Sequence, residues 1–138
     1  MILLDTNVVS EVMRPKPSGN VVNWLNQQNS GSLFLSSITI AEICYGLRIL
    51  PIGRRRQELE TRFETFIAQG FAGRIIGFDE SAARAYAEIM GKRKEEGLPM
   101  SLPDGQIAAV AQISHLALAT RNIRDFENCG LELINPFE

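Results

Sequence analysis

The chain has 138 residues and a mass of 15.3 kDa, which is the size of one compact domain with a buried core. Hydrophobic residues make up 45% of it and charged residues 22%, which excludes an intrinsically disordered, collagen-like or coiled-coil protein. The formal net charge of -2 argues against a protein that coats nucleic acid, but it is compatible with a nuclease, whose metal-holding end is acidic.

Cysteine and histidine usage excludes several kinds of site. The chain has two cysteines, Cys44 and Cys129, and one histidine, His115, whereas a structural zinc site needs about four such ligands. His115 lies in an apolar run, and we expect it to pack or cap at a helix end. The reduced thiols, and an N-terminus that reaches Asp5 after a short apolar stretch, predict a cytoplasmic protein without a signal peptide or membrane anchor.

The first half of the chain alternates short apolar runs with helical patterns. Its predicted elements are a strand at 2–4, a helix at 8–13, a helix around 21–25, a strand at 33–35 and a helix at 39–50. Pro15 and Pro51 end the first and the third of these helices.

The same alternation continues to the C-terminus. A helix that begins near Arg54 places Leu59, Phe63, Phe66 and Ile67 on one face. The remaining predicted elements are a strand at 74–78, a helix capped by Asp79 or Ser81 that ends at Gly97, a helix at 103–115, and strands at 117–120 and 131–134. Short apolar strands separated by helices predict a doubly wound α/β domain over 1–138, with a mostly parallel central sheet covered on both faces.

Four acidic residues fall at corresponding places in this pattern. They are Asp5 after the first strand, Glu42 in the first turn of the helix after the second strand, Asp104 at the start of the 103–115 helix, and Asp125 after the 117–120 strand. Ligands of open α/β sheets bind outside the carboxyl ends of the strands. We therefore expect the four carboxylates to share one pocket.

Helix capping is the alternative for each acid taken singly. Asp5 and Asp125 could each cap a helix or turn, Thr39 to Glu42 is a capping-box pattern, and Ser101 to Asp104 approximates one. As a group the four favour a metal pocket, because clustered carboxylates repel one another unless a cation or a bound proton offsets their charge. Oxygen ligands select a hard ion, Mg²⁺ or Mn²⁺.

Four segments, in order, carry a resemblance to a known family. They are residues 3–8 (LLDTNV), 36–47 (SSITIAEICYGL), 103–109 (PDGQIAA) and 119–126 (ATRNIRDF). Through them the chain resembles PIN-domain ribonucleases, and more narrowly the VapC and FitB-like toxins of bacterial type II toxin–antitoxin systems. The resemblance spans the whole chain and implies a three-layer α/β/α PIN-like domain.

The resemblance also implies a site and an activity. Asp5, Glu42, Asp104 and Asp125 match the family's acidic quartet, with Asp5 and Asp104 as direct metal ligands. The matching polar positions around the pocket are Thr6, Asn7, Thr120 and Asn122. The implied activity is Mg²⁺- or Mn²⁺-dependent endoribonuclease cleavage by a metal-activated water, which leaves 5′-phosphate and 3′-hydroxyl ends.

Basic residues are candidates for contacts with RNA phosphates. Arg121 and Arg124 lie next to the predicted pocket and are the preferred ones. The two basic runs, Arg54 to Arg56 and Lys92 to Lys94, are either solvated helix faces or RNA contacts.

Three other classes of protein have partly matching patterns. A response-regulator receiver domain needs an acidic pair after its first strand and a lysine after a late one, and the chain has neither arrangement. A haloacid-dehalogenase-type phosphatase needs a DxD motif, in which Asn7 here replaces the second Asp. A non-catalytic PIN-like binding module would lack part of the acidic quartet, whereas this chain retains all four acids.

The resemblance finally implies partners. These are an RNA substrate, a small cognate antitoxin that commonly carries a DNA-binding half, and a second copy of the chain in a homodimer that joins a larger assembly. Leu47 and residues 49–52 form an apolar stretch at a helix end, and ordinary core packing is one explanation for it. Residues 49–52 exceed what one helix end usually buries, which favours a groove for an amphipathic partner helix. An inhibitor leading from that groove towards Asp5 and Asp104 could place an Arg or Lys among the carboxylates.

Overall fold

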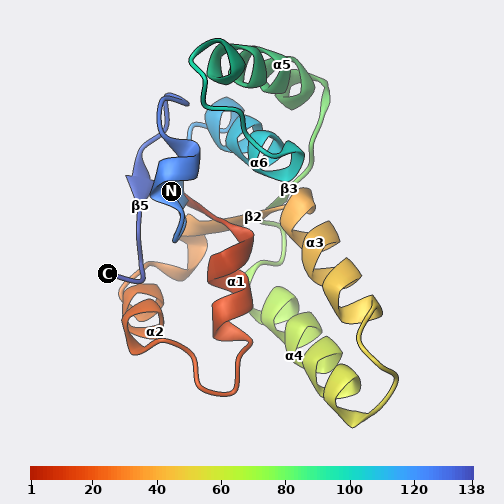
Figure 1. The fold of residues 1–138 in the computed structure, drawn as a ribbon. Coiled ribbons are helices and arrows are strands. Elements are labelled where there is room, and N and C mark those ends of the chain that lie inside the picture. The colour runs from red at the N-terminus through yellow and green to blue at the C-terminus, as the bar shows by residue number, and fades with distance from the viewer.

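The computed structural model describes every residue, 1–138, and combines a five-stranded sheet with helices (Figure 1). Its strands are β1 (Ile2–Leu4), β2 (Leu33–Ser36), β3 (Ile75–Ile76), β4 (Ala117–Ala119) and β5 (Leu133–Ile134). Its α-helices are α1 (Thr6–Val12), α2 (Gly19–Asn26), α3 (Ser37–Arg48), α4 (Arg54–Gly70), α5 (Glu80–Glu95) and α6 (Leu102–Ile113), and the short 3₁₀ turns are η1 (Ser30–Ser32) and η2 (Ile123–Phe126). None of the helices is both long and apolar enough to cross a membrane.

The strand order is β3-β2-β1-β4-β5, and all four neighbouring pairs are parallel. The predicted α/β class with a mostly parallel sheet is therefore confirmed. Because β1 is central and parallel to its neighbours, the carboxyl ends of β1, β2 and β4 lie at one edge. Asp5 and Thr120 lie at that edge, directly after β1 and β4, and α3 begins there after β2.

Two hydrophobic cores lie on opposite faces of the sheet, because successive strand residues point to opposite sides. Leu3 and Leu118 pack with Ile107 of α6 and with α5 on one face. Leu4 packs with Val8 of α1, with Phe63 of α4 and with α2 on the other. Figure 1 shows α5 and α6 on one side of the sheet and α1, α2 and α4 on the other, which gives the expected three layers.

Three strands are shorter than predicted, and of these the 117–120 strand loses only its last residue. The strand predicted at 74–78 is only Ile75–Ile76, because Arg74 belongs to a turn in which its backbone N–H donates to the carbonyl of Phe71 at 2.8 Å. The strand predicted at 131–134 is only Leu133–Ile134, because the chain leaves a turn at Gly130, where φ is 70°.

Helix ends depend on capping residues. Asp5 is the N-cap of α1, so that helix begins at Thr6 rather than at residue 8. Asp79, not Ser81, caps α5, since its carboxylate accepts from the backbone N–H of Ala82 at 2.9 Å. His115 follows α6 with a φ of 55° and is exposed, which confirms its place at a helix end.

Candidate active site

Asp5 is held at the carboxyl end of the central strand. Its backbone N–H donates to the carbonyl of Ala119 at 2.9 Å, which continues the pairing of β1 with β4. Its side chain accepts from the backbone N–H of Thr6 at 2.7 Å and from the hydroxyl of Thr120 at 2.8 Å. Only 4% of Asp5 is exposed. The residue therefore caps α1, as the alternative prediction held, and also points a carboxylate into the site.

Burial raises the pKa of Asp5 from 3.8 to about 6. The two hydrogen bonds from Thr120 and Thr6 act in the opposite direction, and the charges of Asp104 and Glu42 raise the pKa further. Negative charge at this position is thus incompletely compensated by the protein itself.

Glu42 reaches the site from α3. Its carboxylate accepts from the hydroxyl of Thr6 at 2.7 Å. The predicted capping box from Thr39 to Glu42 is wrong, because Ser36 caps α3 and accepts from the backbone N–H of Thr39 at 3.2 Å. The helix begins at Ser37, so Glu42 lies in its second turn rather than its first.

Asp104 enters from the first turn of α6. Ser101 caps this helix, and its hydroxyl oxygen accepts from the backbone N–H of Asp104 at 3.3 Å. Burial raises the pKa of Asp104 and the nearby charges of Asp125 and Glu42 raise it further, while the Ser101 side chain, acting on the carboxylate, lowers it. Gly105 lets α5 approach closely here, since an added Cβ would lie 2.4 Å from the sulfur of Met90.

Three of the four predicted acids line one cavity of about 500 Å³. The lining residues are Asp5, Thr6, Asn7, Ser10, Glu11, Arg14, Glu42, Asp104, Arg121 and Asn122. Asp125 is exposed on η2 and does not line the cavity, although its charge acts on Asp104. Asn122, not Asp125, precedes η2, so Asp125 is not its cap. No three Asp, Glu, His or Cys side chains are close enough to hold an ion alone.

The predicted polar residues Asn7, Thr120 and Asn122 form a network around the Asp5 carboxylate. Thr120 is fully buried and accepts from the backbone N–H of Asn122 at 3.0 Å, besides donating to Asp5. The Asn7 amide donates to Thr120 at 3.4 Å and accepts from the backbone N–H of Arg121 at 3.2 Å. These contacts fix the Asp5 carboxylate between α1 and the loop after β4.

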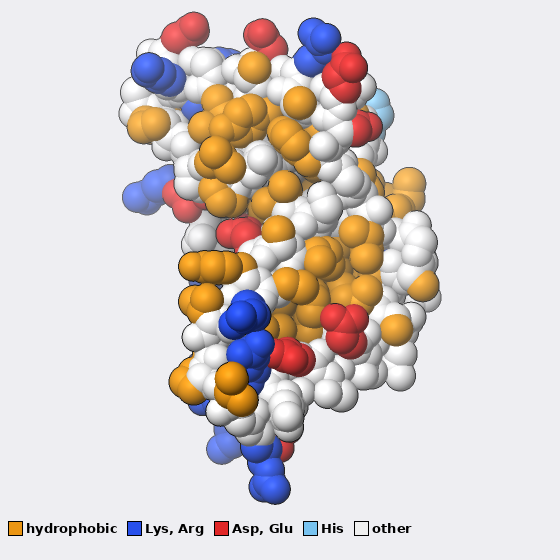
Figure 2. Space-filling model, turned by 90° about the vertical axis from the view of Figure 1, so that its right-hand side faces the viewer, with side chains coloured by type: hydrophobic (Ala, Val, Ile, Leu, Met, Phe, Trp, Pro, Cys, Tyr) orange, Lys and Arg blue, Asp and Glu red, His pale blue; other side chains and the backbone are white.

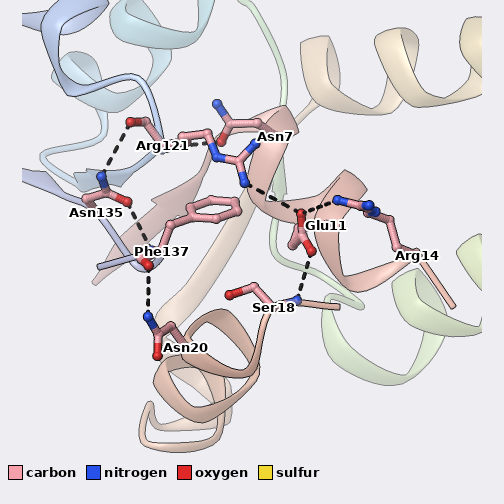
Figure 3. A network of polar contacts seen from close by, with 8 residues as sticks. All are labelled: Asn7, Glu11, Arg14, Ser18, Asn20, Arg121, Asn135 and Phe137. Atoms are coloured by element: carbon pink, nitrogen blue, oxygen red, sulfur yellow. Dashed lines mark hydrogen bonds and ion pairs between the residues drawn. The ribbon is translucent and has the colours of Figure 1, made fainter. Parts of the chain in front are cut away.

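Glu11 is a buried acid of the cavity wall that the sequence analysis missed (Figure 3). It accepts from the backbone N–H of Ser18 at 2.8 Å and forms ion pairs with Arg14 at 3.3 Å and Arg121 at 3.8 Å. The Ser18 hydrogen bond, followed by the two arginines, lowers the pKa of Glu11. The available signal was Glu11 near the end of the helix that follows Asp5, with Arg14 three residues later.

Arg121 lies on the cavity wall and is tied to the C-terminal segment (Figure 3). Its guanidinium stacks 4.0 Å from the centre of the Phe137 ring, and its carbonyl accepts from the Asn135 amide at 3.4 Å. The guanidinium side chain remains 54% exposed. Arg124 is also exposed, but it is not among the lining residues.

The residues of each basic run differ in their exposure to solvent. Arg56 pairs with Glu60 at 2.6 Å within α4, and Arg54 and Arg55 are exposed. In the second run Arg93 is buried, whereas Lys92 and Lys94 are exposed. Only the exposed members are available to a ligand.

The apolar stretch after α3 is partly free of the core. Ile49 is 62% exposed and Ile52 is 92% exposed, whereas Leu47 and Leu50 are half-buried. Figure 2 shows hydrophobic side chains, mixed with arginines and acids, over the part of this face formed by α3 and α4, and a second group over α5 and α6. A cavity of about 640 Å³ between α1, α3 and α4 shares Thr6 and Glu42 with the acidic cavity.

The fold and site together define an α/β protein with clustered acids at the carboxyl edge of a parallel sheet. A family model described as PIN domain matches residues 2–130. The chain belongs to the PIN domain family.

Individual relatives match the chain along almost its whole length. The VapC ribonuclease Y4jK of Sinorhizobium fredii is 41% identical over 138 residues, which cover 100% of this chain and 99% of the relative. Toxin FitB of Neisseria gonorrhoeae is 42% identical over 137 residues, 99% of each chain. A solved structure of FitAB bound to an IR36 DNA fragment matches with a TM-score of 0.94 and 40% identity, covering 100% of this chain and 96% of that one.

Proposed function

We propose that this chain is the toxin of a type II toxin–antitoxin pair and that it hydrolyses RNA phosphodiester bonds with the help of Mg²⁺ or Mn²⁺. The observation that carries the proposal is the buried Asp5, which shares one cavity with Glu42 and Asp104 in a chain of the PIN domain family. Relatives named as VapC ribonuclease and toxin FitB support the same activity and role.

The donor set fits a hard divalent cation. The cavity offers carboxylate, hydroxyl and amide oxygens but no thiol or imidazole, and such ligands suit Mg²⁺ and Mn²⁺. A cation would also offset the charges of Asp104 and Glu42, which add to the effect of burial in raising the pKa of Asp5. Asp5 and Asp104 would hold the ion, with Glu42 and Asp125 acting through water, because no three acids are close enough to hold it alone.

A bound cation supplies a water of lowered pKa and offsets charge on the phosphoryl oxygens. The residues of the chain prepare the site for it. Thr120 and the Thr6 backbone orient the Asp5 carboxylate, and the Thr6 hydroxyl orients Glu42. These contacts exist before any ligand binds, so little reorganisation is needed when charge develops.

The same proposal includes partners. The FitAB structure combines a related chain with DNA, which supports a cognate antitoxin that binds DNA for this chain. We place the antitoxin on the exposed residues Ile49 and Ile52, because Leu47, two residues before Ile49, lines a cavity that also contains Glu42. We also expect a homodimer in the cytoplasm as the unit that joins the larger complex.

The test is metal-dependent RNA cleavage by the purified chain. We expect total cellular RNA to be cut in Mg²⁺ or Mn²⁺, the rate to fall by about 100-fold or more in EDTA, and excess Mg²⁺ to restore it. End mapping should find 5′-phosphate and 3′-hydroxyl ends. Cleavage that persists in EDTA, or a failure to cut any RNA in either metal, would contradict the proposal.

Arg121 and Arg124 are proposed to contact RNA phosphates. Replacing Arg121 with Ala should weaken RNA binding across sequences and reduce the dependence of log K on log salt by about 0.7 for one lost phosphate contact to a single strand. Arg124→Ala should act in the same direction. The control is Arg84→Ala, which removes an exposed guanidinium that pairs with Glu80 on α5. A salt slope equal to that of the parent chain would assign Arg121 to its contacts with Glu11 and Phe137 alone.

A further inference from the structure

Arg93 is buried although it stands in the middle of a basic run. Only 4% of it is exposed, while the adjoining Lys92 and Lys94 are on the surface of α5. A charged group is rarely placed inside a protein without a partner, because it loses the hydration that it has in water. The position of this side chain therefore needs a reason.

The partners of Arg93 are backbone carbonyls of the η2 region. One terminal guanidinium nitrogen donates to the carbonyl of Asp125 at 3.1 Å, and the other donates to the carbonyl of Glu127. No carboxylate forms an ion pair with Arg93, and its buried Nε has no hydrogen-bond partner. Two carbonyls compensate a buried cation less completely than a carboxylate does.

Both carbonyls belong to the short turn that carries Asp125. Phe126, between them, is 1% exposed and anchors the turn in the core, and Arg93 holds the backbone on each side of it. The two contacts thus limit the position of the Asp125 backbone from α5, an element with no residue in the lining of the acidic cavity. Asp125 itself has no side-chain hydrogen bond that would orient it.

We propose that Arg93 is a positioning residue for Asp125: by binding the carbonyls of Asp125 and Glu127 it fixes η2 and holds this carboxylate beside the acidic cavity. The inference rests on the proposed function, because it gives Asp125 a part in holding the metal. It assigns Arg93 to the site rather than to a solvated face or to RNA contact.

The test is a double-mutant cycle of Mn²⁺ affinity, measured by calorimetry on the metal-free chain. Arg93→Met and Asp125→Asn should each raise the Kd for Mn²⁺ by about 10-fold, as expected for residues that support metal ligands. The double variant should bind Mn²⁺ no more weakly than Asp125→Asn alone, because both substitutions remove the contribution of the Asp125 carboxylate to metal binding. Lys94→Met, which removes an exposed charge next to Arg93, should leave the Kd unchanged.

Amide hydrogen exchange supplies a readout that does not depend on metal. Exchange at the Asp125 and Glu127 amides should be faster in Arg93→Met than in the parent chain, and Arg93→Lys should restore part of the protection. If Arg93→Met does not fold, Arg93→Lys replaces it in the cycle, with a smaller effect in the same direction.

Different outcomes separate this inference from the function on which it rests. A parent chain that binds no Mn²⁺ and cleaves no RNA overturns both. A parent that binds Mn²⁺, together with effects of Arg93→Met and Asp125→Asn that simply add, overturns the positioning role alone. Unchanged amide exchange in Arg93→Met also overturns it.

Discussion

At a Mg²⁺ concentration that saturates the parent chain, the Asp104→Asn variant is expected to cleave RNA more slowly by about 100-fold or more. The substitution keeps the size of the side chain and removes its charge. The cap of α6 is preserved, because the capping hydrogen bond runs from the backbone N–H of Asp104 to the Ser101 hydroxyl oxygen and does not use the Asp104 carboxylate. The loss should therefore come from the site and not from unfolding.

The rate is measured on a defined RNA identified by end mapping, and circular dichroism checks the fold. Glu95→Gln is the matched control, since it removes one negative charge from an exposed position at the end of α5. Its rate should equal that of the parent chain. Retained cleavage by Asp104→Asn would remove Asp104 from the proposed metal site.

Asp5→Asn is expected to change the pH dependence of stability in EDTA. In the parent chain the folded state binds the Asp5 proton more tightly than the unfolded state, because the pKa rises from 3.8 to about 6 on folding. The free energy of unfolding should therefore fall as pH rises from about 4 to about 6. Above that range, keeping Asp5 ionised in the folded state lowers the free energy of unfolding by about 3 kcal/mol.

The variant lacks this penalty, although it loses one of the two hydrogen bonds that the carboxylate accepts, which costs about 1 kcal/mol. Asp5→Asn should thus be more stable than the parent at pH 7.5 by about 1–2 kcal/mol, and slightly less stable at pH 4. Urea denaturation in EDTA at the two pH values measures this. A variant that is less stable at both values would show that the carboxylate serves mainly as a helix cap. Added Mg²⁺ should stabilise the parent chain more than the variant.

The sequence pattern predicted the parallel sheet and the three acids of the cavity well, because each depends on local order along the chain. Asp5 follows a strand directly, Asp104 opens a helix, and Glu42 lies in the helix that follows β2. Parallel pairing then brings these elements to one edge. Capping details were less accurate, since both Ser36 and Thr39 are suitable caps and the choice depends on where β2 ends.

Glu11 and Arg93 were beyond the reach of the pattern, because their environments are made by distant segments. Glu11 contacts Ser18 and also Arg121, which is far from it in the sequence. Arg93 lies between two lysines, and only the η2 carbonyls, more than thirty residues later, explain its burial. Composition alone cannot separate such a residue from its solvated neighbours.

The two edges of the sheet restrict how other chains can bind. β3 and β5, at the two ends of the strand order, have only two residues each. Strands this short offer few free backbone N–H and C=O groups for another chain to pair with, so neither aggregation by strand pairing nor recognition by strand addition is favoured. A protein that binds this molecule is therefore expected to recognise side chains of its helices and of the loops between them, such as Ile49 and Ile52, and its specificity can change by substitution there without disturbing the sheet.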